Sequence, residues 1–305
     1  MDIPIVFACD DHYALPTAVA ITSLIANKNA ATSYDVRILT NALSGFHAQR
    51  LASLAVPGVS VTLMEIPDRH HDIPGHGHVT STTLYRLALP ELFPTHDSVL
   101  YLDGDIIILS DLSELLGLAH GQCYASVVQQ VNICDLPPFA YHSRPKEFNA
   151  GILLLNLKRM RDENMYPRLI EAVVRNNIGA NDQLALNQLF NEDVRWTDII
   201  YNYASIYDFL LADKEAARHF NTSPAEWRRI RKHPVIIHYI DAKPWIARRC
   251  LHAAAWRRYF SLSPYRDVAL PFRRSPRAFV IVLLNAVFPM FMRPLLRRFY
   301  VRFIK

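Results

Sequence analysis

Two aspartates separated by a glycine lie between apolar runs in YLDGDIIILS (101–110). Asp-Gly between hydrophobic segments is a strong local signal for a type I′ β-hairpin, and this rule taken alone favours a turn with solvated carboxylates. The alternative is a metal site. Gly104 lets the backbone turn, so that Asp103 and Asp105 could both reach one Mg²⁺ or Mn²⁺ while a nucleotide diphosphate supplies further oxygens. Such an ion would stabilise a departing diphosphate.

A second candidate site lies in HYIDAKPW (238–245). His238 could be a third metal ligand, because neutral imidazole binds the same class of ions. Lys243 could neutralise a phosphate as a compact charge. A single histidine on an apolar strand is more commonly a hydrogen-bonded core residue. The lysine five residues later, on a loop that Pro244 stiffens, favours the site.

Other polar residues lie near the ends of apolar segments, and each has a structural alternative. Asn149 precedes Ala150 at the head of an apolar run, where its amide could bind sugar hydroxyls or serve a turn. Asp182 and Gln183 open a short helical pattern, in which Asp182 is equally a helix cap. Arg86 lies in a predicted helix, where an arginine is commonly just solvated. None of these residues is specific by itself.

Composition excludes several classes of protein. The 305 residues are 51% hydrophobic and 20% charged, as in a globular protein with a substantial core. The four cysteines show no CxxC spacing, which predicts reduced thiols in a cytosolic protein. The N-terminus has no basic region typical of a signal peptide. Residues 273–305 hold eight of the 33 basic residues and no acidic residue, so the remainder has 25 basic and 28 acidic residues. The sequence shows neither basic residues spread over a folded face nor a recognisable nucleic-acid-binding module, so nucleic-acid binding is not predicted.

Strand and helix patterns alternate in the first half, which predicts an α/β fold with a mostly parallel sheet. Strands are expected over 5–9, 35–39, 59–66 and 98–102, with helices over 15–25, 45–54 and 82–92. Ligands bind at the carboxyl ends of such strands, so Asp10 and Asp11 should share one rim with Asp103 and Asp105. Further along, we expect strands over 148–157 and 234–240, helices over 158–177 and 181–190 (with Asn181 or Asp182 as its cap), and loops with small helices over 201–234.

The C-terminal segment has a different pattern. Residues 279–292 are apolar but too few to span a bilayer. On a helical wheel, residues 295–303 place leucines and aromatics on one half and Arg297, Arg298 and Arg302 on the other. This pattern is typical of an interfacial helix on an anionic leaflet. The alternative is a basic helix that packs on its own domain or on a second subunit.

Six motifs in this order resemble the family 8 retaining glycosyltransferases, which include bacterial lipopolysaccharide and lipooligosaccharide galactosyl- and glucosyltransferases. The resemblance covers about residues 3–250 and implies a glycosyltransferase A-type, single Rossmann-like domain. It favours the metal interpretation of Asp103-Gly104-Asp105. The motifs are FACDDHY (7–13), TTLYRLALPELF (82–93), VLYLDGDIII (99–108), FNAGILLLNL (148–157), NDQLALN (181–187) and HYIDAKPW (238–245).

The resemblance implies roles at matching positions. Ala8 and Asp10 correspond to residues around the uracil and ribose of a UDP-sugar, and Lys243 to the lysine on the diphosphate. Donor-sugar contacts are implied for Arg86, Asn149, Ala150 and Asp182, and Gln183 corresponds to the residue facing the anomeric carbon. The implied ligands of Mn²⁺, with Mg²⁺ as the alternative, are Asp103, Asp105 and His238.

The implied reaction retains anomeric configuration. A double displacement would need a nucleophile at Gln183, and a neutral amide is a poor one. Front-face attack is therefore favoured, with the leaving diphosphate helping to deprotonate the acceptor hydroxyl and the protein positioning the reactants.

Three departures from the family pattern stand out. Asp241 replaces the usual glycine and Lys243 lies one residue earlier than usual, so the loop is shorter. Gln129 and Gln130 stand where relatives often place an aspartate near the acceptor, and His12 replaces an asparagine.

We therefore predict a catalytic domain over residues 1–260 and a basic amphipathic, membrane-associating tail over 261–305. The predicted activity is transfer of galactose or glucose from a UDP-sugar to a saccharide acceptor, such as lipopolysaccharide core or another lipid-linked glycan. The tail would place the enzyme peripherally on the cytoplasmic face of the cell membrane. The alternatives are a nucleotide-sugar hydrolase and a membrane-bound scaffold with a decayed donor site.

Overall fold

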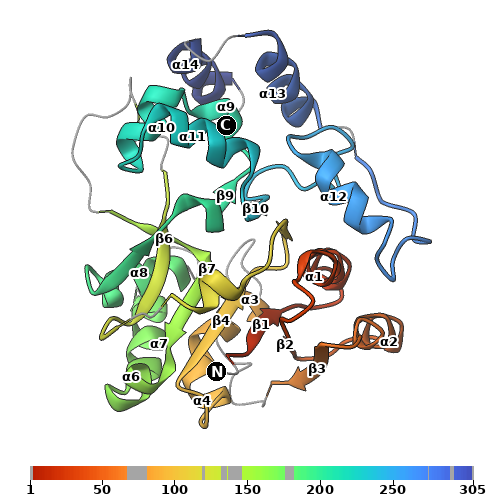
Figure 1. Cartoon of the computed structure of the whole chain (residues 1–305), viewed down its shortest axis with the longest axis vertical. Helices are drawn as coiled ribbons and strands as arrows, with labels where there is room; N and C mark the ends of the chain where they lie inside the picture. The colour runs from red at the N-terminus through yellow and green to blue at the C-terminus, as the bar shows by residue number, and fades with distance from the viewer. Residues whose placement is uncertain are drawn as a thin grey trace.

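A computed structural model describes residues 3–66, 81–118, 121–131, 136, 146–175, 182–273, 275–288 and 292–303. Within them a seven-stranded sheet has the order β3-β2-β1-β4-β7-β6-β8, and a three-stranded sheet has the order β5-β10-β9 (Figure 1). The strands are β1 (Ile5–Ala8), β2 (Tyr34–Thr40), β3 (Val59–Glu65), β4 (Ser98–Leu102), β5 (Ile106–Ile108), β6 (Ala125–Gln129), β7 (Phe148–Asn156), β8 (Val194–Thr197), β9 (Tyr203–Ala204) and β10 (Ile236–His238).

Helices surround both sheets. Those of the first half are α1 (Ala14–Asn27), α2 (Gly45–Ala52), α3 (Ser81–Leu84), the 3₁₀ helix η2 (Tyr85–Ala88), α4 (Leu89–Leu92) and α5 (Ser113–Leu116). Those of the second half are α6 (Leu157–Asp162), α7 (Met165–Arg175), α8 (Asp182–Phe190), the 3₁₀ helix η4 (Ile199–Tyr201), α9 (Tyr207–Leu210), α10 (Asp213–His219), α11 (Pro224–Lys232), α12 (Ala253–Phe260), α13 (Pro276–Val287) and α14 (Arg293–Phe303).

The predicted α/β class with a mostly parallel sheet is confirmed. β1 pairs in parallel with β2 and β4, and β2 pairs in parallel with β3. β7 is the exception, because it runs antiparallel to both β4 and β6. Its reversed direction brings its first residues to the rim where β1 and β4 end, as the pairing of Leu102 with Ile152 shows.

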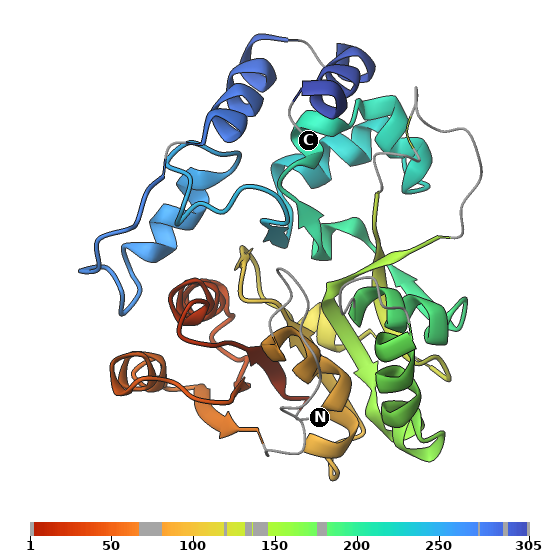
Figure 2. The same ribbon diagram turned by 180° about the vertical axis from the view of Figure 1, so that it is seen from behind.

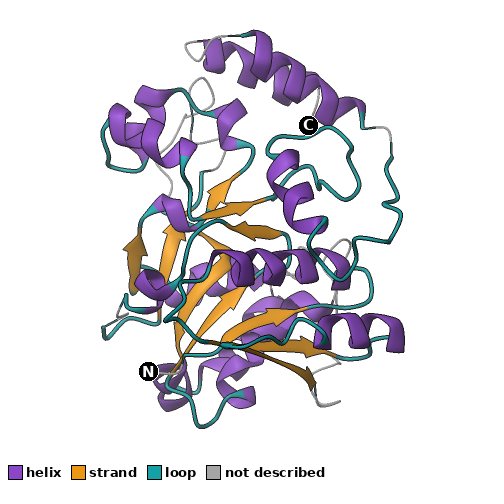
Figure 3. Cartoon of the chain, turned by 45° about the vertical axis from the view of Figure 1, so that its right-hand side comes forward, coloured by secondary structure: helices purple, strands orange, loops and turns teal. Residues whose placement is uncertain are grey.

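The central strands β1, β4 and β7 of the main sheet are buried on both faces, with helices on both sides (Figure 3). Successive strand side chains point to opposite faces, so Ile5 and Phe7 of β1 pack in one core cluster and Val6 packs in another. The first cluster includes residues of α1, and the second includes residues of α6, α7 and α8. A sheet buried on both faces requires apolar strands of the kind found here.

The hairpin interpretation of Asp103-Gly104-Asp105 is wrong. β4 pairs with β1 and β7 of the large sheet, whereas β5 pairs with β10 of the small one. The segment therefore carries the chain from one sheet to the other. A Cβ on Gly104 would lie 2.3 Å from the Oγ1 of Thr17, so any larger residue would have to displace the Thr17 side chain of α1.

Two predicted helices are interrupted. The expected helix over 158–177 is α6 and α7, separated at Asn164, whose φ of 51° ends the first helix in the left-handed region that asparagine tolerates. The expected helix over 82–92 is three short segments, and Pro90 near the start of α4 lacks the N–H that a continuous helix needs. Small helices over 201–234 are confirmed. The short strand β9 was not predicted. Asn181 and one of the four cysteines, Cys134, lie outside the described residues.

The C-terminal helices pack on the rest of the chain. Figures 1 and 2 place α13 and α14 at the opposite end of the molecule from α4 and α6. Ile281, Leu296 and Tyr300 belong to the main core cluster. Arg297, which the helical wheel places on the polar half, is fully buried and bonded by two nitrogens to the Glu215 carboxylate at 2.6 and 2.9 Å. The expectation that Arg297 faces outward is therefore wrong, because a helical wheel ignores a buried acidic partner.

Among the described residues, the longest apolar helices fall short of what crossing a bilayer would need.

Candidate active site

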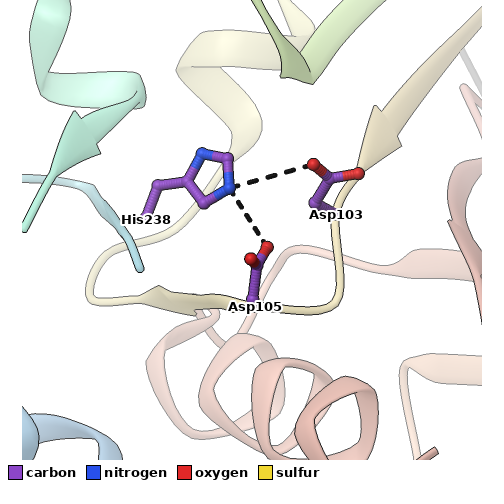
Figure 4. A group of neighbouring side chains, drawn as sticks. All are labelled: Asp103, Asp105 and His238. Atoms are coloured by element: carbon purple, nitrogen blue, oxygen red, sulfur yellow. Dashed lines mark hydrogen bonds and ion pairs between the residues drawn. The ribbon is translucent and has the colours of Figure 1, made fainter. Parts of the chain in front are cut away.

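Three predicted metal ligands converge at the junction of the two sheets. Asp103 follows β4, Asp105 precedes β5, and the imidazole of His238 at the end of β10 faces both (Figure 4). The Nε2 of His238 lies 3.1 Å from Asp105 Oδ1 and 3.8 Å from Asp103 Oδ2, and one ligand atom of each residue lies within 4.8 Å of the others. Two carboxylates and one imidazole form a donor set suited to Mn²⁺.

A chain of hydrogen bonds determines the tautomer of His238. The backbone N–H of Gly151 can only donate, so the atom of Asn149 at 3.0 Å is its oxygen. That oxygen also accepts from Asn202 Nδ2 at 3.0 Å, which directs Asn202 Oδ1 at the Nδ1 of His238, 2.9 Å away. Nδ1 therefore carries a proton, and in the neutral imidazole the Nε2 lone pair points at the carboxylates.

This arrangement fits a bound cation. An unprotonated Nε2 facing carboxylate oxygens is repulsive unless a positive charge lies between them. A second hydrogen bond that orients a ligating histidine is a regular feature of metal sites. Asn202, which lies in a segment expected to be irregular, is a site residue that the sequence analysis missed, and a single asparagine without a motif offers no local signal.

Gly151 makes room for the cluster. A Cβ at this position would lie 2.3 Å from His238 Cε1, 2.7 Å from Asp103 Oδ2 and 2.9 Å from Asn149 Oδ1. The carbonyl of Gly151 accepts from the backbone N–H of Asp103 at 2.8 Å, so the first ligand is aligned by β7. The presence of glycine at position 151 in FNAGILLLNL is thus explained by the close approach of the ligand side chains.

Arg86 is buried beside the cluster rather than solvated. It pairs with Asp103 Oδ1 at 3.0 Å and with Asp182 Oδ2 at 2.7 Å, and it donates to the carbonyl of Ala150. Its guanidinium also lies 4.6 Å from the centre of the Tyr101 ring. Burial lowers the pKa of Arg86, but the two carboxylates outweigh burial and raise it, so the side chain remains charged. Arg86 therefore connects η2 with Asp103, which follows β4, and with Asp182, the first residue of α8.

The Gln183 amide has a defined orientation. Its Oε1 accepts from the backbone N–H of Ala150 at 3.0 Å and from Asn149 Nδ2 at 3.2 Å. Its Nε2 donates to Gln130 Oε1 at 2.9 Å. Because the backbone N–H can only donate, the oxygen end of Gln183 points towards β7. Gln130, noted in the sequence only as a departure from the family, is thus a direct neighbour of the predicted catalytic residue.

Lys243 closes the cluster on the other side. Its Nζ pairs with Asp105 Oδ2 and donates to the carbonyl of Tyr239 at 2.5 Å. Burial raises the pKa of Asp105, but the adjacent ammonium group of Lys243 is the largest of the effects that oppose burial, and that pKa is well below its usual range. Burial likewise lowers the pKa of Lys243, and Asp105 raises it above its usual value. The lysine is therefore a charged group next to the metal ligands.

Ala8 and Asp10 lie at the carboxyl end of β1, which pairs with β4. Asp10 Oδ1 accepts from the backbone N–H groups of His12 and Tyr13, both at 3.0 Å, immediately before α1. This aspartate therefore has a local structural role in the turn that leads into the helix. The common rim predicted for the β1 and β4 aspartates is confirmed by the parallel pairing of these strands.

Comparisons with known proteins agree with this geometry. The family model described as glycosyl transferase family 8 matches residues 4–248. Lipopolysaccharide 1,2-glucosyltransferase of Escherichia coli is 25% identical over 286 residues, covering 87% of this chain and 79% of that protein. Glycosyltransferase GlyE of Streptococcus pneumoniae serotype 4 is 30% identical over 171 residues, covering 55% of this chain and 38% of GlyE.

Solved structures share the fold. Galactosyltransferase LgtC, in complex with donor and acceptor sugar analogues, has a TM-score of 0.69 at 24% identity, covering 87% of this chain and 99% of LgtC. The bifunctional glycosyltransferase WbbM has a TM-score of 0.70 at 23% identity, covering 87% of this chain and 50% of WbbM. The chain thus spans about half of WbbM and less of GlyE. It shares with LgtC and WbbM the glycosyltransferase A fold.

Proposed function

This chain belongs to glycosyl transferase family 8, and we propose that it is a retaining, metal-dependent hexosyltransferase that transfers galactose or glucose from a UDP-sugar to a saccharide acceptor. The observation that carries the proposal is the orientation of His238, whose Nδ1 is held by Asn202 so that Nε2 faces Asp103 and Asp105 beside the charged Lys243. Two carboxylates, an imidazole and an ammonium group are suited to a cation and a diphosphate at the same place.

Each end of the donor has candidate partners. Ala8 and Asp10, on the rim beside β4, would bind the uracil and ribose. Lys243 would neutralise the diphosphate. Asp103, Asp105 and His238 would hold Mn²⁺, with Mg²⁺ as the alternative. When bound, the ion would supply Lewis-acid stabilisation of the charge that develops on the departing diphosphate.

The donor sugar would lie between β7 and α8. Arg86 ties Asp103 to Asp182, so one rigid group of side chains borders both the metal site and the proposed sugar site. Asp182 would accept hydrogen bonds from sugar hydroxyls, and Asn149 and Ala150 would line the same site. Positioning of this kind contributes to catalysis by fixing the reacting atoms in a productive geometry.

Front-face attack agrees with the state of Gln183. Its oxygen already accepts two hydrogen bonds, and a neutral amide is a poor nucleophile. In the proposed reaction the bond from the anomeric carbon to the diphosphate oxygen breaks, and the bond to the acceptor oxygen forms on the same face. The acceptor proton goes to the departing diphosphate. Gln183 and Asp182 would position the sugar and stabilise its developing positive charge.

The proposed acceptor is a lipid-linked saccharide, such as lipopolysaccharide core, at the cytoplasmic face of the membrane. Phe279, Leu283 and Val287 of α13 form an exposed apolar stripe at i, i+4 and i+8. The guanidinium of Arg249 lies 5.2 Å from the centre of the Phe279 ring, so a basic group borders the stripe. Apolar and cationic side chains together suit an anionic lipid surface. The division into a catalytic part (1–260) and a membrane-associating part (261–305) belongs to this proposal.

Calorimetric titration of UDP, with and without Mn²⁺, tests the donor site. We expect Mn²⁺-dependent binding that is lost in Asp105→Asn while the circular dichroism spectrum is unchanged. UDP release from UDP-galactose and UDP-glucose, with and without a saccharide acceptor, then separates transfer from hydrolysis, because a hydrolase releases UDP without acceptor. Wild-type protein that binds no UDP in either condition would favour a scaffold. Sedimentation with vesicles should require phosphatidylglycerol and should not occur with phosphatidylcholine alone.

A further inference from the structure

One ion pair joins the C-terminal helices to the loop of Lys243. Arg277, in the first turn of α13, places Nη2 2.6 Å from Oδ1 of Asp241. Asp241 lies between His238 and Lys243, and it is the residue that replaces the usual family glycine. The contact therefore links an element outside the two sheets to the segment that carries a metal ligand and the proposed diphosphate lysine.

The pair is part of a larger contact. Isolated ion pairs on a protein surface contribute little, because water screens them and side-chain entropy opposes them. Here Arg277 also donates to the hydroxyl of Tyr300 in α14, and its guanidinium lies 5.3 Å from the centre of that ring. Tyr300 is buried and packs against Phe209 of α9, with ring centres 5.9 Å apart. Arg277 is thus held by a buried aromatic residue.

Apolar packing covers the same loop from the same side. Ala247, Cys250 and Ala253 form a buried cluster with Ala278 of α13, and Ala242 packs against it. Ala278 is the residue next to Arg277, so the first turn of α13 contacts the loop through both the guanidinium of Arg277 and the methyl group of Ala278. Removal of the ion pair should loosen the loop while most of this packing remains.

The loop has two further attachments on the catalytic side. His238 is fixed by Asn202, and Lys243 pairs with Asp105. When a diphosphate competes for Lys243, the attachment of Lys243 to Asp105 weakens, and the ion pair of Asp241 with Arg277 continues to hold the turn from the other side. The position of Lys243 in the occupied site then depends on α13.

We propose that Asp241 and Arg277 are positioning residues of the donor site, through which α13 holds the Lys243 loop in the conformation that binds the diphosphate. This inference rests on the proposed function. It assigns to the C-terminal helices a role in donor binding in addition to any contact with lipid.

The direction in which one substitution changes the affinity for UDP separates a positioning role from simple electrostatics. Asp241→Asn removes a negative charge near the proposed diphosphate site, so through-space electrostatics alone predicts tighter UDP binding. Loss of positioning predicts weaker binding. We expect the Kd of UDP in the presence of Mn²⁺ to rise on the order of tenfold in Asp241→Asn, as is typical for coupled residues in one network.

The experiment is calorimetric titration of UDP into the full chain with Mn²⁺. Arg277→Gln is the second variant and should give a similar loss, and the double variant should lose no more than either single variant. The controls are Asp267→Asn, which removes the carboxylate of another arginine pair (with Arg50), and Arg298→Gln, an exposed arginine of α14. Both controls should bind UDP like the wild type.

Equal or tighter UDP binding by Asp241→Asn, together with wild-type binding by Arg277→Gln, overturns the inference while leaving the proposed function intact. A wild-type protein that binds no UDP overturns both. If Asp241→Asn does not fold, Arg277→Gln alone decides the outcome, because a wild-type Kd in that variant is incompatible with a positioning role.

Discussion

Asn202 offers a sharp test of the metal site, because it acts on His238 without being a ligand. In the structure it accepts the Nδ1 proton of His238 at 2.9 Å and is itself oriented by Asn149. Asn202→Ala removes that acceptor in a buried place. The alternative tautomer can then donate from Nε2 to Asp105 Oδ1, 3.1 Å away, which occupies the lone pair that a metal requires.

The magnitude follows from this change. Loss of an orienting hydrogen bond to a ligating histidine typically lowers metal affinity by about 10- to 100-fold, which corresponds to roughly 1.4–2.8 kcal/mol. Asn202→Asp keeps an acceptor opposite Nδ1 and should therefore bind Mn²⁺ far better than Asn202→Ala. The affinity is measured from the electron paramagnetic resonance signal of free Mn²⁺, which disappears on binding and does not depend on turnover.

Asn156→Ala is the matched control. Asn156 is also a buried asparagine, but it caps α6 by accepting from the backbone N–H of Arg159 at 3.0 Å, far from the cluster at the other end of β4. Its loss should lower the free energy of unfolding by about 1 kcal/mol and leave the Mn²⁺ affinity unchanged. If Asn202→Ala binds Mn²⁺ within threefold of the wild type, the tautomer argument is refuted.

Two further predictions concern buried groups away from the metal site. Glu215→Ala leaves the fully buried guanidinium of Arg297 without its carboxylate. Urea denaturation should therefore show a loss of about 3–5 kcal/mol in the free energy of unfolding. A loss below about 1 kcal/mol would mean that the pair behaves like an ion pair on the surface. Burial raises the pKa of Cys9 to about 12, so at pH 8 only about one thiol in 10,000 is ionised. The folded protein should therefore resist iodoacetamide at Cys9, with a rate that rises as pH approaches 12, and mass spectrometry showing rapid modification at pH 8 would contradict this environment.

Much of the site was predictable because its chemistry is local in the sequence. Asp103 and Asp105 are two residues apart, and alternating strand and helix patterns place the residues after β1 and β4 on one rim. The order of six motifs was sufficient to indicate the family. Lys243 follows His238 by five residues, so the end of one strand and the turn after it could bring both residues to one site.

Long-range pairing decided what local patterns left open. The Asp-Gly signal for a hairpin was overruled because β4 and β5 pair with strands of different sheets. Arg86, which as a helical residue would commonly be solvated, is buried because two carboxylates from distant segments neutralise it. Arg297 is buried for the same reason, since Glu215 lies 82 residues earlier in the chain.

The sequence by itself determined the α/β class, the family and the identity of the candidate ligands, because these depend on periodicity and on motifs of a few residues. Only the tertiary structure decided that the antiparallel β7 delivers Asn149 and Gly151 to the rim, and that Asn202 sets the tautomer of His238. It alone placed Arg277 on Asp241. The physical reason is that a hydrogen bond or an ion pair between distant residues depends on the complete packing of the chain, and a single polar residue leaves no local trace of the partner it will meet.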